Sequence, residues 1–159
     1  MPANLRESTL TRPPIGYKRR VAWGDVDASG AWRFTAALSY VEEAETQLMR
    51  EAGILEEDTP RLPRIYVDAQ FKSPAHFDDE VVVHLSISRI GTSSVHYEFV
   101  IVKDNDVAVE GRLGVAFVGP SGTSEPLPKG IRSAFAASWR TRATGQVTGE
   151  ADGARLRRR

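Results

Sequence analysis

The sequence contains no cysteine, which limits the chemistry that its 159 residues can support. Disulfide bonds, thiolate zinc sites and cysteine nucleophiles are excluded, and a reducing compartment is permitted. No apolar run approaches the roughly 18 residues of a membrane-spanning helix, and the first residues lack the apolar segment of a signal peptide. We therefore expect a cytoplasmic protein with no part in a membrane.

The chain also lacks an excess of charge of either sign, because 21 Lys and Arg residues balance 21 Asp and Glu residues. The balance indicates neither an acidic nor a basic partner, and we expect no nucleic-acid partner. Residues 1–14, which include Pro13 and Pro14, are assigned to a flexible arm. Residues 140–159 end in ARLRRR and are assigned to a disordered basic tail. A single domain is expected from 15 to 139.

Common motifs of nucleotide, serine and metal enzymes are absent too. The sequence has no P-loop, no G-x-G-x-x-G and no G-x-S-x-G. Its histidines, His76, His84 and His96, do not have the spacing of zinc ligands. We expect neither a metal nor a cofactor.

What the sequence does contain is one helical pattern followed by four strand patterns. Apolar residues recur from Leu38 to Ala52 with a period of about 3.6 residues, Thr35 is a candidate N-cap, and Gly53 is a candidate stop. A short strand is expected at 17–23 and a short closing helix at 130–137. Apolar and polar residues alternate in RIYVDAQF, VVVHLSISRI, SVHYEFVIV and VAVEGRLGVAFV, each half covered by the core. Short turns between the last three predict antiparallel pairing, and hence an α+β domain with a curved sheet around one helix.

The stretch WGDVDASGAWRF joins the first strand to the helix. Asp25 and Asp27 are ordinary turn residues in such a loop, because Asp accepts hydrogen bonds from its own backbone. The same spacing also places a carboxylate beside a helix N-terminus, where amide groups are unpaired. The residues alone leave both interpretations open. Asp25 is assigned a structural role, and Gly30 a positive φ or a close backbone approach.

Four segments in this order resemble the hotdog-fold acyl-CoA thioesterases that are similar to 4-hydroxybenzoyl-CoA thioesterase. They are VAWGDVDASG, YVEEAETQLMREAGI, FKSPAHFDDEVVVHLSISRIGTSSVHYEFVI and EPLPKGIRSAF, and the resemblance covers 17–137. It implies a single hotdog domain, in which a curved antiparallel sheet wraps one central helix. It also implies an acyl-CoA substrate and a homodimer or homotetramer with active sites at the subunit interface.

The resemblance assigns the chemistry to particular residues. Asp27 matches the family's catalytic aspartate, which acts as nucleophile or general base, and the backbone amide of Phe34 matches the oxyanion donor. Trp32 shapes the acyl pocket or is packed in the core. A second hotdog branch uses a helix glutamate, so Glu42 or Glu45 assists or replaces Asp27, or forms a salt bridge at the helix edge.

The sequence departs from the family at one point. Many relatives have a histidine shortly after the motif's glycine, where this chain has Ala31, Trp32 and Arg33. Two other functions stay open: a hotdog hydratase or dehydratase acting on acyl thioesters, and a non-catalytic acyl-CoA-binding module. The acyl group, the choice of CoA or a carrier protein, and the residues that bind CoA phosphates are also left open.

Overall fold

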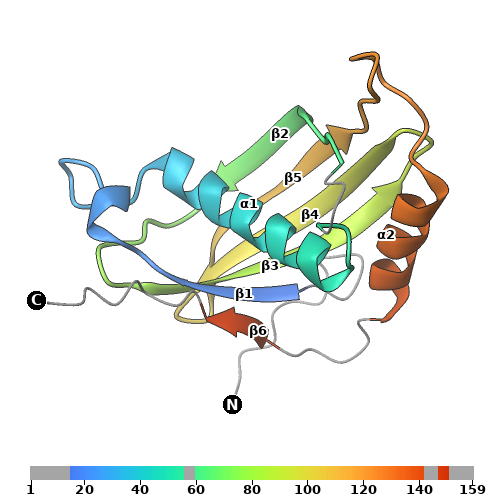
Figure 1. Cartoon of the computed structure of the whole chain (residues 1–159). Coiled ribbons are helices and arrows are strands. Elements are labelled where there is room, and N and C mark those ends of the chain that lie inside the picture. The colour runs from blue at the N-terminus through green and yellow to red at the C-terminus, as the bar shows by residue number, and fades with distance from the viewer. Residues whose placement is uncertain (1–14, 56–59, 142–146, 151–159) are drawn as a thin grey trace, which may run out of the picture.

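The computed structural model describes residues 15–55, 60–141 and 147–150. It confirms the predicted single sheet with one long helix (Figure 1). The elements in chain order are β1 (Ile15–Arg20), the 3-10 turn η1 (Trp23–Asp25), α1 (Phe34–Glu51), β2 (Arg64–Phe71), β3 (Glu80–Ile90), β4 (Ser94–Lys103), β5 (Asp106–Ala116), α2 (Lys129–Thr141) and β6 (Val147–Glu150). The strands form one sheet in the order β2-β5-β4-β3-β1-β6.

The four strands predicted after the helix pair in antiparallel fashion, as expected. Between β4 and β5 the chain reverses at Asp104 and Asn105, whose φ angles are 50° and 67°. Asp and Asn tolerate this left-handed conformation, which two-residue hairpin turns require. The β2 strand pairs with the far side of β5, with Val67 opposite Leu113, and therefore lies at an edge of the sheet.

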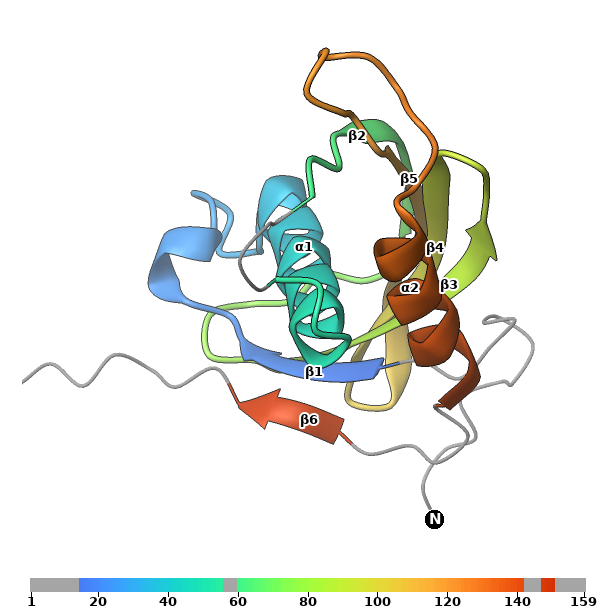
Figure 2. The ribbon, with the colours of Figure 1, turned by 45° about the vertical axis from the view of Figure 1, so that its right-hand side comes forward.

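The helix α1 lies across the concave face of the sheet, and α2 lies beside it at one end (Figure 2). The predicted apolar stripe of α1 is buried, as in Val41, Ala44 and Leu48. It packs on the inward side chains of the central strands, such as Leu85 and Phe99. Burial of these apolar groups is the main favourable contribution to folding.

The region between β1 and α1 differs from the predicted boundaries. The first strand ends at Arg20 rather than Trp23, because the chain turns into η1. Thr35 is not the N-cap: α1 begins at Phe34, and its N-cap residue is Arg33, whose side chain makes no capping hydrogen bond. The backbone performs this function instead, since the carbonyl of Arg33 accepts from the amides of Ala36 and Ala37.

The C-terminal region also differs from the expected tail. The helix α2 continues to Thr141, and β6 pairs with β1 in parallel. A strand fits here because the free edge of β1 offers backbone donors and acceptors that need partners. The rest of the segment 140–159, at 142–146 and 151–159, lies outside the described residues, as does the predicted arm at 1–14.

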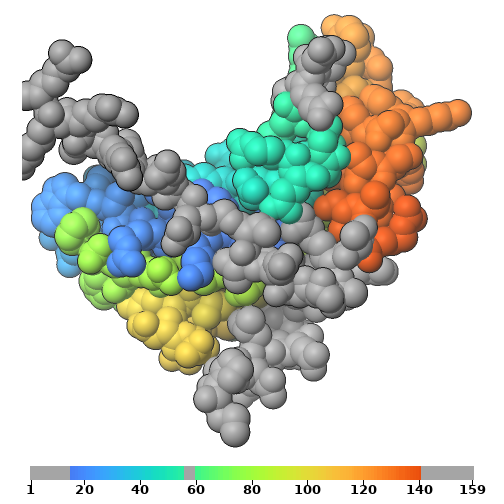
Figure 3. Space-filling view, turned by 60° about the horizontal axis from the view of Figure 1, so that its bottom comes forward, coloured from blue at the N-terminus to red at the C-terminus, as the bar shows by residue number. Residues whose placement is uncertain are grey.

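The inward face of β2 is less covered than its alternation predicts. Val67 and Phe71 lie on that face, opposite Leu113 and Val109, and they are 45% and 46% exposed. The chain's own core therefore stops short of this edge strand. Figure 3 shows that the last turns of α1 and the segment leading to α2 also reach the surface of the molecule. In the described ranges, no helix has the length and apolar character needed to cross a membrane.

Candidate active site

The stretch between η1 and α1 forms a tight turn at 27–30. The amide of Asp27 donates to the carbonyl of Ala31 at 2.9 Å, and the amide of Gly30 donates to the carbonyl of Asp27 at 3.0 Å. Gly30 has φ +84°, so the predicted positive φ is confirmed. A Cβ at Gly30 would meet no atom within 4 Å, so the backbone conformation and not a close approach explains this glycine.

The carboxylate of Asp27 is exposed on this turn. Its Oδ1 accepts hydrogen bonds from the amide of Ser29 at 2.7 Å and from Ser29 Oγ at 2.5 Å. These two bonds lower the pKa of Asp27, and the positive charge of Arg33 lowers it to a smaller degree. At neutral pH the group is therefore an ionised carboxylate, the state that a nucleophile or a general base needs.

The amide of Phe34 is the first of helix α1. Within the described ranges no acceptor pairs with it, whereas the preceding amide, of Arg33, donates to the carbonyl of Asp25 at 2.8 Å. Such an unpaired N–H at the positive end of a helix can stabilise a developing oxyanion. The turn that carries Asp27 thus leads directly to a free amide.

Asp25, the first aspartate of the stretch, has structural contacts. Its Oδ2 accepts from the hydroxyl of Tyr40 at 2.5 Å and from the amide of Ala22 at 3.2 Å. Tyr40 is buried in the middle of α1, and burial together with the nearby Asp25 raises its pKa. The bond from Tyr40 joins the loop to the helix. It also occupies Oδ2 of Asp25, which supports the structural role assigned to this residue.

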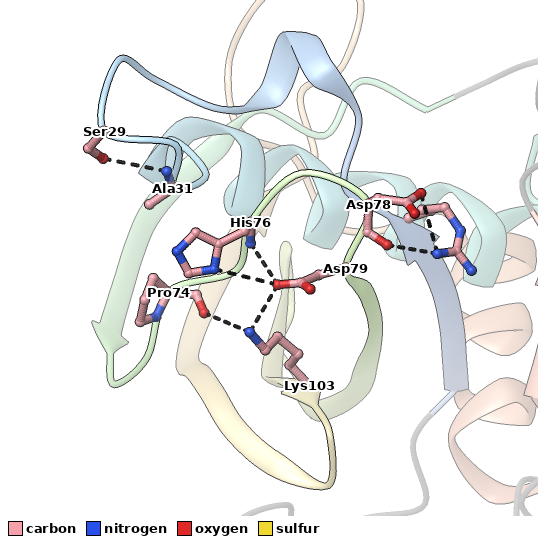
Figure 4. A network of polar contacts seen from close by, with 8 residues as sticks. Ser29, Ala31, Pro74, His76, Asp78, Asp79 and Lys103 are labelled. Atoms are coloured by element: carbon pink, nitrogen blue, oxygen red, sulfur yellow. Dashed lines mark hydrogen bonds and ion pairs between the residues drawn. The ribbon is translucent and has the colours of Figure 1, made fainter.

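A second segment, 72–79, supports the turn from the other side (Figure 4). The carbonyl of Ala75 accepts from the amide of Trp32 at 2.8 Å, and Ala31 pairs with His76 as an antiparallel bridge. Asp79 holds this segment in shape, because its Oδ2 accepts from the amide of His76 at 2.7 Å and from Lys103 Nζ at 2.9 Å. The same two donors lower the pKa of Asp79. The position of the turn thus depends on β4 as well as on α1.

The remaining predicted site residues lie in two places. Trp32 is 6% exposed and packs in the core, with its ring centroid 6.3 Å from that of Tyr40. Glu45 is buried and forms an ion pair with Arg64 Nη2 at 2.5 Å, and Glu42 lies 3.5 Å from the same nitrogen. Along the helix axis these glutamates are about 12 and 16 Å from Phe34. The salt bridge that was one predicted alternative for these glutamates is present.

Three contacts of this region were not foreseen from the sequence. Ser29 lies two residues after Asp27, which is the spacing at which Asp and Ser form local turns, so a signal for this contact existed. Tyr40 has no such signal, because it fits the apolar stripe of the helix. Arg64 has none either, since its partner Glu45 is distant in sequence. Among the described residues, no group of three His, Cys, Asp or Glu side chains is arranged to hold a metal ion.

Comparisons with known proteins show which family and which solved structures this chain is similar to. The model of the family described as the Thioesterase superfamily matches residues 35–110. A 1,4-dihydroxy-2-naphthoyl-CoA hydrolase of Synechococcus sp. (strain WH7803) is 28% identical over 134 residues, which are 76% of this chain and 87% of that protein.

Solved structures agree with this match. A gentisyl-coenzyme A thioesterase is 27% identical, with a TM-score of 0.67 over 76% of this chain and 98% of the other. A 1,4-dihydroxy-2-naphthoyl-CoA thioesterase from Synechocystis has a TM-score of 0.70, 21% identity, and covers 77% of this chain and 96% of its own. At that identity the second likeness supports the fold alone.

The fold and these relatives together indicate a thioester hydrolase with a hotdog fold. The predicted resemblance to the hotdog-fold thioesterases is thereby confirmed: the Thioesterase superfamily model matches just under half of the chain, and the fold extends the likeness over three quarters of it.

Proposed function

We propose that the protein hydrolyses acyl-CoA thioesters to a free acid and CoA, with Asp27 and the Phe34 amide as its catalytic groups. The observation that carries this proposal is their arrangement: an ionised, exposed carboxylate lies on a fixed turn, and the unpaired first amide of α1 follows it. Thioester hydrolysis needs these two functions, a nucleophile or base and a donor for the carbonyl oxygen.

In the nucleophilic route, a carboxylate oxygen of Asp27 attacks the thioester carbonyl carbon. The carbonyl electrons move to oxygen, and the Phe34 amide stabilises the resulting negative charge. Collapse of this tetrahedral species breaks the carbon–sulfur bond, releases the CoA thiolate and leaves a mixed anhydride, which water then hydrolyses. In the general-base route, Asp27 removes a proton from a water molecule that attacks the same carbon. Loss of one preorganised oxyanion donor typically lowers kcat by about 10²–10³-fold.

An aromatic acyl group is the first substrate class to test. The relatives named above act, by their names, on dihydroxynaphthoyl-CoA and gentisyl-CoA. In this chain the residue at the start of α1, Phe34, has a 65% exposed side chain, and Phe71 of β2 is 46% exposed. Exposed aromatic side chains at the start of α1 and on the edge strand offer apolar surface that would favour a flat apolar acyl group over a polar one.

A homodimer with active sites at the subunit interface fits the same observations. Within the described chain, β2 is an edge strand that has only β5 as a neighbour. Its inward residues Val67 and Phe71 are about half exposed. An open edge with an apolar face is unfavourable in water, and a second copy would cover it. Sedimentation equilibrium tests this proposal, and a monomer at the concentration of the activity assay would contradict it.

The test of the proposed reaction measures thiol release from aromatic, short and long acyl-CoAs by the wild type and Asp27→Asn. We expect release from at least one aromatic acyl-CoA and a loss of about 10²–10⁴-fold in kcat for the variant. Full activity of Asp27→Asn would contradict the assignment. Tight acyl-CoA binding without release would favour a binding module, and interconversion of hydroxyacyl and enoyl thioesters would favour a hydratase.

A further inference from the structure

We propose that Ser29 is a positioning residue for the reaction: its amide and hydroxyl donors hold Oδ1 of Asp27, which leaves Oδ2 as the oxygen that acts on the substrate. This inference rests on the proposed function, because it assigns a role around the carboxylate of Asp27. It concerns a side chain that lies beside the reacting group and does not itself touch the substrate.

The contacts of the turn carry the inference. Two donors from one residue converge on one oxygen, the amide of Ser29 at 2.7 Å and its Oγ at 2.5 Å. Oδ2 of Asp27 has no donor among the residues that the structure describes. A carboxylate with one saturated oxygen cannot rotate freely, so its free oxygen keeps a fixed direction.

The backbone hydrogen bonds of the turn also hold Ser29 in place. Its backbone is closed by the bond from the amide of Gly30 to the carbonyl of Asp27 at 3.0 Å. The amide of Ala31 approaches Ser29 Oγ at 3.4 Å, and Figure 4 shows Ser29 at the tip of this turn, next to Ala31. The hydroxyl can therefore accept from Ala31 while it donates to Asp27.

Other charged groups in this part of the molecule have separate partners or weaker effects. Arg33 is the cation that acts on Asp27, and its influence is smaller than that of Ser29. Asp25 is engaged by Tyr40. In the supporting segment, Asp79 is held by Lys103, and His76 lies 3.7 Å from Asp79. Ser29 is thus the main group that sets the state of the Asp27 carboxylate.

The role predicts a change in pH dependence. Donors to a carboxylate favour its ionised form, so they lower its pKa. Removal of the Ser29 hydroxyl raises the pKa of Asp27 towards its usual value. Because the ionised form is the active one, the acid limb of the kcat/KM profile then moves to higher pH. A role of Ser29 in folding alone would lower the fraction of active protein without moving this limb.

The experiment compares the wild type with Ser29→Ala, Ser29→Thr and Ser121→Ala. Ser29→Thr keeps the hydroxyl donor. Ser121→Ala is a matched control, because Ser121 Oγ also donates to a nearby carboxylate, that of Glu125 at 2.9 Å, in a loop after β5. For each protein, the carboxyl carbon of Asp27 is titrated by ¹³C NMR, and thiol release from an aromatic acyl-CoA is measured across pH.

For Ser29→Ala we expect a higher Asp27 pKa, an acid limb shifted upward by the same amount, and a lower kcat at an unchanged KM. Ser29→Thr should restore the wild-type limb, and Ser121→Ala should keep it. An unchanged Asp27 pKa in Ser29→Ala would overturn the proposal. A raised pKa with an unmoved limb would also overturn it, but there the fault lies in the catalytic role of Asp27, because the titration still shows the contact.

Discussion

The helix α1 has an acidic group before its first turn and another in its middle, and the two are held in opposite ways. Asp27 is exposed and held by two neutral donors, and one oxygen is left free. Glu45 is 4% exposed and held by the cation of Arg64. A buried acid needs an opposite charge because water no longer stabilises it. An exposed acid needs none, so it can keep an oxygen for chemistry. Burial and the ion pair thus favour a structural role for Glu45, and the exposure of Asp27 supports its proposed role in the reaction.

Removal of Glu45 is expected to have the largest effect on stability. Glu45→Ala leaves Arg64 without its closest partner in a partly buried position, and we expect a loss of about 2–4 kcal/mol in the free energy of unfolding. Urea denaturation measures it. The control is the double variant Glu45→Met, Arg64→Met, which removes both charges and should recover much of the loss. A double variant as unstable as Glu45→Ala would contradict this view of the pair.

The hydroxyl of Tyr40 joins the two regions, since it reaches from the helix to Asp25 in the loop. Tyr40→Phe removes one hydrogen bond to a carboxylate, which is expected to lower the free energy of unfolding by about 1.5–3 kcal/mol. Tyr66→Phe is the control, because Tyr66 is 41% exposed and its hydroxyl contacts a ring nitrogen of His96 at 3.0 Å rather than a carboxylate. The free energy of unfolding of both variants is measured by thermal or urea unfolding. Equal losses of stability in the two variants would contradict the interpretation.

A substitution at Gly30 tests the geometry of the turn alone. Gly30→Ala places a side chain at φ +84°, a conformation that costs about 1–2 kcal/mol for an L-residue. We expect this modest loss in stability together with a lower kcat, because relief of the strain would move Asp27. Gly24→Ala is the control, since a Cβ there also meets no atom within 4 Å and Gly24 has no positive φ. Equal kcat values for the two variants would show that the turn conformation is unimportant.

Much of the fold was predictable from local patterns. The alternation in the strands and the apolar stripe of α1 arise because particular side chains are buried away from water. The four strands after the helix and the helix itself could therefore be predicted from the pattern of apolar residues, and the structure confirms them. The boundaries next to α1 were not, because they depend on backbone bonds between Arg33 and Asp25 rather than on a capping side chain such as Thr35. Parallel pairing of β6 is a long-range event that local patterns do not record.

The candidate site also contains residues that the sequence could predict and contacts that it could not. Asp27, Gly30 and Phe34 lie within one stretch of eight residues, 27–34, so a resemblance confined to that stretch was enough to select them. The ion pair of Glu45 with Arg64 joins residues from α1 and β2, and only the folded chain shows it. The support that Asp79 and Lys103 give to the turn is hidden from the sequence for the same reason.

One measurement separates the two acids: kcat and the unfolding midpoint, determined side by side for Asp27→Asn and Glu45→Gln with an aromatic acyl-CoA. We predict that Asp27→Asn loses about 10²–10⁴-fold in kcat and keeps its midpoint, because its side chain is exposed and isosteric. Glu45→Gln should lower the midpoint and keep kcat in the folded protein. The reverse pattern, with activity lost in Glu45→Gln and retained in Asp27→Asn, would place the chemistry in the middle of α1 and contradict the role of the turn.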